Sequence, residues 1–168
     1  SILQQTEKIR GNIAEIGVYK GGSAKIICEM TKKNVHLFDT FEGLPKPSQG
    51  DYPNKFIRGD YKSSYEDVRN YLRKYKNATI YKGVFPSSSV SIKNKKFSLI
   101  HLDVDLYEST KKSLEFLYPR MNKGGVIISH DYESLMGVRK AVDEFFVNKP
   151  EIIMGPFVGS TQCFIIKI

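Results

Sequence analysis

The 168-residue sequence has no tryptophan, only two cysteines and no apolar run close to the length of a bilayer span. A membrane-spanning helix needs about 20 consecutive apolar residues, and residues 1–5 lack the basic-then-apolar pattern of a secretory signal. We therefore expect a cytoplasmic protein without membrane contact. Cys28 and Cys163 have no Cys-x-x-Cys partner, so we expect reduced thiols in the core and no disulfide framework.

Basic residues outnumber acidic ones by 26 to 18, which gives a formal net charge of +8. A clustered excess of this size would indicate a nucleic-acid surface. The lysines are scattered instead, as at Lys32–Lys33 and Lys111–Lys112, and mostly flank the expected strands and helices. We interpret them as a solvated surface. An anionic substrate or partner is the alternative, and nucleic acid is not the partner that we expect.

Apolar segments alternate with helical patterns along the chain. Five segments are typical of buried strands: 12–18, 34–40, 78–84, 97–103 and 125–129. Helical patterns cover 23–32, 64–75, 109–118 and 135–146, and a β-hairpin is predicted from 151–158 and 162–168. Strands that alternate with helices need crossover connections, which produce a parallel sheet covered on both faces. We predict one doubly wound α/β domain over residues 1–168, with an antiparallel C-terminal hairpin.

Ligands of such sheets bind beyond the carboxyl ends of the strands, near the point where the strand order reverses. After the first strand comes a turn with the spacing Gly-x-x-x-Gly-Gly, formed by Gly17, Gly21 and Gly22. This spacing matches neither the dinucleotide fingerprint nor the P-loop. The segment is either a tight turn without a ligand or a binding site for the amino-acid part of a ligand. Asp39 ends the second strand, where a carboxylate either binds ribose hydroxyls or caps its loop. Together these features indicate a ligand that carries a ribose.

Asp103 and Asp105 follow the fourth strand, and His130 and Asp131 follow the fifth. If these strands are neighbours, their side chains converge and can hold a divalent cation that activates a substrate hydroxyl. Two alternatives stay open: the carboxylates cap a helix or face solvent, or a metal-free site uses Asp103 or His130 as general base. His101, inside the fourth strand, is interpreted as a core histidine.

Several blocks of this sequence resemble the macrocin O-methyltransferase family. The longest are EIGVYKGGS at 15–23, FDTFEGLP at 38–45 and HLDVDLYEST at 101–110. Shorter ones are KGVFP at 82–86, LYPR at 117–120, GGVII at 124–128 and AVDEF at 141–145. They run in order along most of the chain.

The resemblance implies a seven-stranded, Rossmann-like class I methyltransferase sheet. It also implies S-adenosylmethionine as methyl donor, a divalent metal, usually magnesium, and a sugar hydroxyl of a natural product or glycan as acceptor. The implied donor-binding residues are Glu15, Gly17, Tyr19, Gly21, Ser23, Asp39, Thr40, Phe41, Gly83, Val84, Phe85 and Asp103. The implied metal ligands are Asp103, His130 and Asp131, with Asp103 and His130 as the catalytic candidates.

Two departures from the family pattern keep alternatives open. Members usually carry an acidic residue where this chain has His130, and imidazole suits softer metals than magnesium. The chain also begins about ten residues before the first strand, so we expect it to lack the family's N-terminal helical cap. A non-catalytic donor-binding domain is therefore one alternative. A nucleic-acid methyltransferase is another, although no Asn-Pro-Pro-Tyr motif follows the fourth strand. A homo-oligomer remains open.

Overall fold

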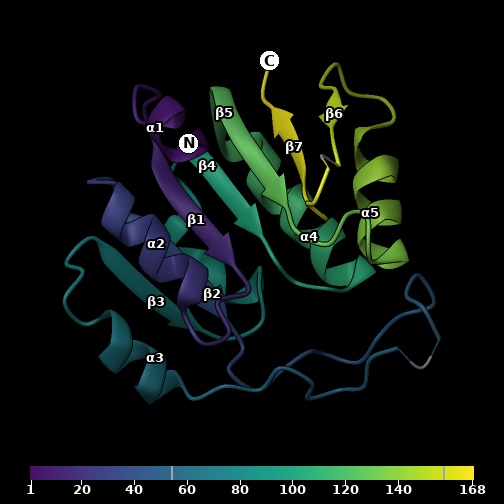
Figure 1. The fold of residues 1–168 in the computed structure, drawn as a ribbon, viewed down its shortest axis with the longest axis horizontal. Coiled ribbons are helices and arrows are strands. Elements are labelled where there is room, and N and C mark those ends of the chain that lie inside the picture. The colour runs from purple at the N-terminus through teal and green to yellow at the C-terminus, as the bar shows by residue number, and fades with distance from the viewer. Residues whose placement is uncertain (54, 157) are drawn as a thin grey trace.

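A computed structural model describes residues 1–53, 55–156 and 158–168 (Figure 1). Seven strands form one sheet in the order β3-β2-β1-β4-β5-β7-β6. Their bounds are Asn12–Ile16 (β1), Val35–Asp39 (β2), Ala78–Lys82 (β3), Phe97–Leu102 (β4), Met121–Ser129 (β5), Ile153–Met154 (β6) and Cys163–Ile166 (β7). The pairs among β1 to β5 are parallel, whereas β7 runs antiparallel to β5 and β6. The predicted fold class is confirmed.

Helices cover both faces of the sheet (Figure 1). The α-helices are Ile2–Thr6 (α1), Gly22–Met30 (α2), Tyr65–Leu72 (α3), Tyr107–Leu117 (α4) and Met136–Phe146 (α5), and the 3-10 helices are Ser87–Ile92 (η1) and Tyr118–Arg120 (η2). Strand side chains alternate in direction, so Leu37 packs with α2 and α3, whereas the adjacent Phe38 packs in the core that contains α4 and α5. None of the described helices is both long and apolar enough to cross a membrane.

The boundaries of several elements differ from the predictions. β5 begins at Met121, four residues early, because Met121 pairs with Phe97 and the strand continues through Gly124, whose φ is 80°. The short elements α1 and η1 were not predicted because each has too few residues for a periodic apolar pattern. β6 and β7 are shorter than the predicted hairpin strands, and residue 157 of the predicted 151–158 strand lies outside the described residues.

The strand order reverses between β1 and β4, since β1 leads to β2 and β3 on one side and β4 leads to β5 on the other. At such a point the loops that follow the two central strands diverge and leave a crevice. The glycine turn after β1 and the Asp103–Asp105 segment after β4 therefore face each other at one edge of the sheet.

Candidate active site

A cavity of about 500 Å³ opens at the carboxyl ends of the central strands. This volume lies within the usual range for small-molecule sites. Eleven of the residues that the sequence proposed for the site line it: Gly17, Tyr19, Ser23, Asp39, Thr40, Gly83, Val84, Phe85, Asp103, His130 and Asp131. The cavity thus joins the glycine turn, the end of β2 and the ends of β4 and β5 in one space.

Three further predicted residues lie behind the cavity wall. Glu15 is fully buried, and its carboxylate accepts a hydrogen bond from Nδ1 of His101 at 2.9 Å. Phe41 is also buried and packs edge-on against the ring of Tyr65. Gly21 directly precedes α2 as its N-cap, with φ of 83°, and faces the side chains of α3. None of these three residues is among those that line the cavity, and the donor contacts that the resemblance implies for them stay a prediction.

Asp39 fastens the glycine turn to the end of β2. Its Oδ2 accepts hydrogen bonds from the backbone N–H groups of Val18 at 2.8 Å and Tyr19 at 2.7 Å, and its Oδ1 accepts one from the N–H of Phe41 at 2.7 Å. A carboxylate offers about four lone-pair positions, so one remains for a group in the cavity. The loop-capping and ribose-binding interpretations of Asp39 are therefore compatible.

Gly17 is required by a close approach between two strand ends. Its φ is 90°, and a Cβ placed on it would lie 1.7 Å from the carbonyl oxygen of Asp103. Any other residue would push β1 and β4 apart at the floor of the cavity. The turn then leads into α2, whose first residues, including Ser23, also line the cavity. Free N–H groups of a helix start are suited to bind a carboxylate.

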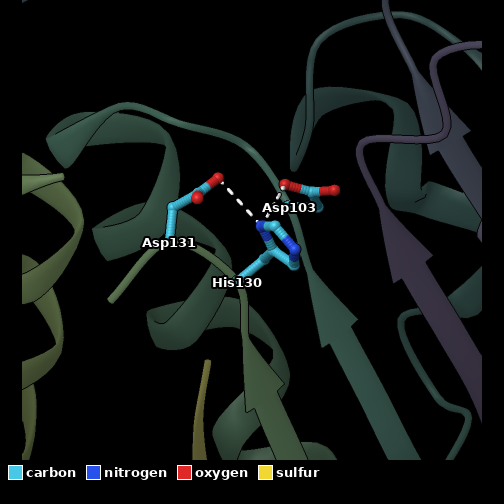
Figure 2. Close-up of side chains that lie close together, drawn as sticks. All are labelled: Asp103, His130 and Asp131. Atoms are coloured by element: carbon cyan, nitrogen blue, oxygen red, sulfur yellow. Dashed lines mark ion pairs between the residues drawn. The ribbon is translucent and has the colours of Figure 1, made fainter. Parts of the chain in front are cut away.

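His130, Asp103 and Asp131 form a compact group on the far wall (Figure 2). Nδ1 of His130 lies 2.9 Å from Oδ2 of Asp131, outside hydrogen-bond geometry, and 3.5 Å from Oδ1 of Asp103. The contact with Asp131 raises the pKa of His130 and lowers that of Asp131. Burial raises the pKa of Asp103 despite the opposing charge of His130. The predicted convergence of these strand ends is thus observed.

The sequence grouped Asp105 with these residues as one of the side chains expected to converge on a divalent cation. Asp105 lines the same cavity, and burial, followed by the charges of Asp103 and Asp131, raises the pKa of Asp105 to about 7. Its φ is 58°, in the left-handed region, and so is that of Asp131 at 56°. Strained non-glycine backbone is concentrated at functional sites. Tyr19 and Tyr61, with φ of 51° and 60°, share both this strain and the cavity.

The loop between β2 and α3 supplies wall residues that sequence reasoning missed. Gly43, Leu44, Pro45 and Tyr61 all line the cavity. The loop is anchored midway by the buried Asp51, whose Oδ1 accepts a hydrogen bond from the backbone N–H of Tyr107 at the start of α4. Only the proline and glycine content of this segment indicated a loop, and nothing in it indicated where the loop would fold back.

The comparison with known families identifies the family of this chain. The model of the macrocin O-methyltransferase family matches residues 3–154. The chain belongs to this family. Among curated proteins it is 27% identical to a demethyldecarbamoylnovobiocin O-methyltransferase of Streptomyces niveus. It is 29% identical to an 8-demethyl-8-(2,3-dimethoxy-alpha-L-rhamnosyl)-tetracenomycin-C 4'-O-methyltransferase of Streptomyces olivaceus. Each match covers 82% of this chain and 58% of the relative's length.

Solved structures agree on the fold. The O-methyltransferase NovP matches with a TM-score of 0.83 at 23% identity, over 99% of this chain and 77% of NovP. A calicheamicin methyltransferase matches with a TM-score of 0.82 at 17% identity, over 98% of this chain and 75% of that protein. At these identities the likeness shows the fold.

Proposed function

We propose that this chain is an S-adenosylmethionine-dependent O-methyltransferase whose acceptor is a hydroxyl on a sugar of a natural product or glycan. The observation that carries the proposal is the single cavity in which the Asp39-fastened glycine turn faces the carboxylates at the ends of β4 and β5. A donor held at the turn would present its methyl group toward those carboxylates. Family membership supports the same reaction.

The donor side has a feature for each part of S-adenosylmethionine. The open lone pair of Asp39 suits a ribose hydroxyl, and the start of α2 at Ser23 suits the methionine carboxylate. On the β3 side, Gly83 leaves the backbone uncovered beside Val84 and Phe85, which offer an apolar surface for adenine. Val84 is 56% exposed, so its side chain is accessible to a flat ligand in the cavity.

The acceptor side must remove a proton from a poorly acidic hydroxyl. Asp103, Asp105 and His130 all line that end of the cavity. Asp103 already lies against His130, whereas Asp105 has no such partner among the contacts of the described residues, so we assign Asp105 as the general base. The acceptor oxygen then attacks the methyl carbon in line with the sulfonium, and positioning of the two substrates supplies much of the rate enhancement.

Asp103, His130 and Asp131 fit a divalent cation, because their donor atoms lie within 4.8 Å of one another. A bound cation would lower the pKa of the acceptor hydroxyl and help to orient it. The acceptor class follows the relatives, one of which is named for a novobiocin precursor and the other for a tetracenomycin with a rhamnosyl group.

Calorimetry with S-adenosylhomocysteine tests the donor half of the proposal. The folded chain should bind this product, and Asp39→Asn should weaken binding by about tenfold or more, because a hydrogen bond to a charged group contributes about 1.5–3 kcal/mol. Asp67→Asn, on the exposed start of α3, is the matched control and should bind normally. Absence of binding by the folded chain, or normal binding by Asp39→Asn, would refute the donor site.

Transfer of a labelled methyl group to a panel of deoxysugar glycosides, with divalent cations present, tests the acceptor half. Methylation of at least one sugar hydroxyl is expected. Tight donor binding without methylation of any acceptor would instead support a non-catalytic donor-binding domain, the alternative that His130 motivates.

A further inference from the structure

The His130 group has the spacing of ligands around one metal ion. Two ligands about 2.1 Å from an ion and at right angles to each other lie roughly 3 Å apart. Nδ1 of His130 lies 2.9 Å from an oxygen of Asp131 and 3.5 Å from an oxygen of Asp103. Both carboxylates point toward the same ring nitrogen from different strand ends (Figure 2). Three donors therefore face a common point without rearrangement.

The surroundings of the group are those of a ligand set. Nδ1 of His130 has almost no solvent exposure, and its two carboxylate neighbours among the described residues lie outside hydrogen-bond geometry. The nitrogen is therefore positioned to bind a cation held between those carboxylates. The second oxygen of Asp131 accepts a hydrogen bond from the hydroxyl of Ser134 at 2.7 Å. Metal-binding carboxylates are commonly oriented by such outer contacts.

The negative charge of the neighbouring carboxylates also favours a bound cation. Asp103, Asp105 and Asp131 line the cavity, and Lys55, whose charge acts on Asp105 and Asp131, donates to the carbonyl oxygen of Ser134 instead. Three carboxylates that share a partly buried space repel one another. A divalent ion among them would offset that repulsion.

We infer that this site selects first-row transition-metal dications over Mg²⁺, with a stronger preference for Zn²⁺ than for Mn²⁺. Mg²⁺ prefers oxygen ligands in near-ideal octahedral geometry, whereas imidazole nitrogen suits Fe²⁺, Ni²⁺, Cu²⁺ and Zn²⁺, and affinity for mixed nitrogen and oxygen donors rises along the first transition row. With two carboxylate oxygens and one imidazole nitrogen, the set matches the transition metals. The inference deepens the proposed function, since it names the ion at the acceptor end of the same cavity.

The experiment is a titration of the metal-free chain with Mg²⁺, Mn²⁺ and Zn²⁺ by calorimetry. The wild type should bind Mn²⁺ and Zn²⁺ at least about tenfold more tightly than Mg²⁺. His130→Asp replaces the nitrogen by a charged oxygen, so the ratio of Mn²⁺ to Mg²⁺ affinity should fall severalfold. His130→Ala should lose Mn²⁺ and Zn²⁺ affinity with little effect on Mg²⁺. Pulsed electron paramagnetic resonance of bound Mn²⁺ should detect a coordinated nitrogen in the wild type and none in either variant.

Three results would overturn the inference: equal or tighter Mg²⁺ binding, a metal preference that His130→Asp leaves unchanged, or no binding of any of these ions. The last would mean that His130 serves as a protonated partner of the two carboxylates. Binding of S-adenosylhomocysteine by the same samples separates these failures from a failure of the proposed function, because the donor end of the cavity lies at Asp39. Thermal unfolding of each variant checks that it is folded.

Discussion

Glu15 and His101 are register partners on β1 and β4, and they form a buried acid–imidazole pair directly beneath the floor of the cavity. Burial alone lowers the pKa of His101, but the hydrogen bond and the charge of Glu15 outweigh it and raise the pKa overall. The ring of His101 also stands perpendicular to that of His130, with centroids 6.3 Å apart. The pair therefore connects the core of the sheet to the carboxylate end of the site.

Removing one member of this pair should destabilise the fold. Glu15→Ala leaves the buried ring of His101 without its hydrogen-bond partner, and breaking a buried pair of this kind costs about 3–5 kcal/mol. Urea denaturation measures the free energy of unfolding. Glu108→Gln, which removes an exposed pair with Lys112 on α4, is the control and should change that energy by less than about 0.5 kcal/mol. Equal effects of the two substitutions would show that the pair has no special structural role.

Gly17→Ala should abolish donor binding and destabilise the chain by several kcal/mol, because the new Cβ would overlap the carbonyl of Asp103. Gly59→Ala separates steric overlap from backbone strain: its φ is 95°, but no atom of the described residues beyond its chain neighbours lies within 4 Å of the added carbon. This control should lose only about 1–2 kcal/mol. Calorimetry measures donor binding by both variants, and chemical denaturation measures their free energy of unfolding. Normal donor binding and stability of Gly17→Ala would contradict the close approach of Gly17 to the carbonyl of Asp103.

Asp105→Asn should lower kcat by about 10²–10⁴-fold, the usual contribution of a general base. Affinity for S-adenosylhomocysteine should stay within about twofold, because Asp105 lies at the other end of the cavity from Asp39. Steady-state kinetics with the best acceptor, together with donor calorimetry, separate the two effects. A kcat close to that of the wild type would move the base role to Asp103 or His130.

His36 should make the fold less stable in mild acid. Burial lowers the pKa of His36 to about 4, while Nδ1 contacts the Tyr81 hydroxyl at 2.9 Å and Nε2 is buried without a hydrogen-bond partner among the described residues. The unfolded chain, with an ordinary pKa near 6.5, binds the proton first, so stability falls as the pH drops from 6.5 to 4. The loss should approach about 3 kcal/mol.

Urea denaturation at pH 7.5 and pH 4.5 measures this effect. His36→Asn removes the titrating group, so its stability should depend less on pH than that of the wild type, even though its absolute stability is lower. Parallel pH dependence in the two proteins would exclude His36 as the source.

The sheet and the position of the cavity could be predicted because the carboxyl ends of parallel strands meet at one end of the sheet, even when the strands are far apart in the sequence. Asp39 ends β2, and Asp103 and His130 directly follow β4 and β5, so the topology alone places them at one end of the sheet. The resemblance implies that Glu15 binds the donor, whereas its pairing with His101, 86 residues away, is visible only in the structure. The local sequence around either residue does not indicate a pairing between positions so far apart in the chain.

The loop from Thr40 to Ser64 was even less predictable. Its course depends on Asp51 binding the start of α4 and on Ser63 donating to the carbonyl oxygen of Tyr19 at 2.7 Å. These contacts join segments that are 56 and 44 residues apart. The sequence of the loop has neither helical nor strand periodicity, so its contribution to the cavity wall emerges only from tertiary contacts.

That loop also lines the cavity and contacts the segment after β5. It borders the donor end through Leu44 and Tyr61, and through Lys55 it reaches the carbonyl of Ser134, the residue that orients Asp131. The segment is also held at Asp51 and at Ser63. We therefore expect a substrate that displaces it at one end of the cavity to alter its contacts at the other end.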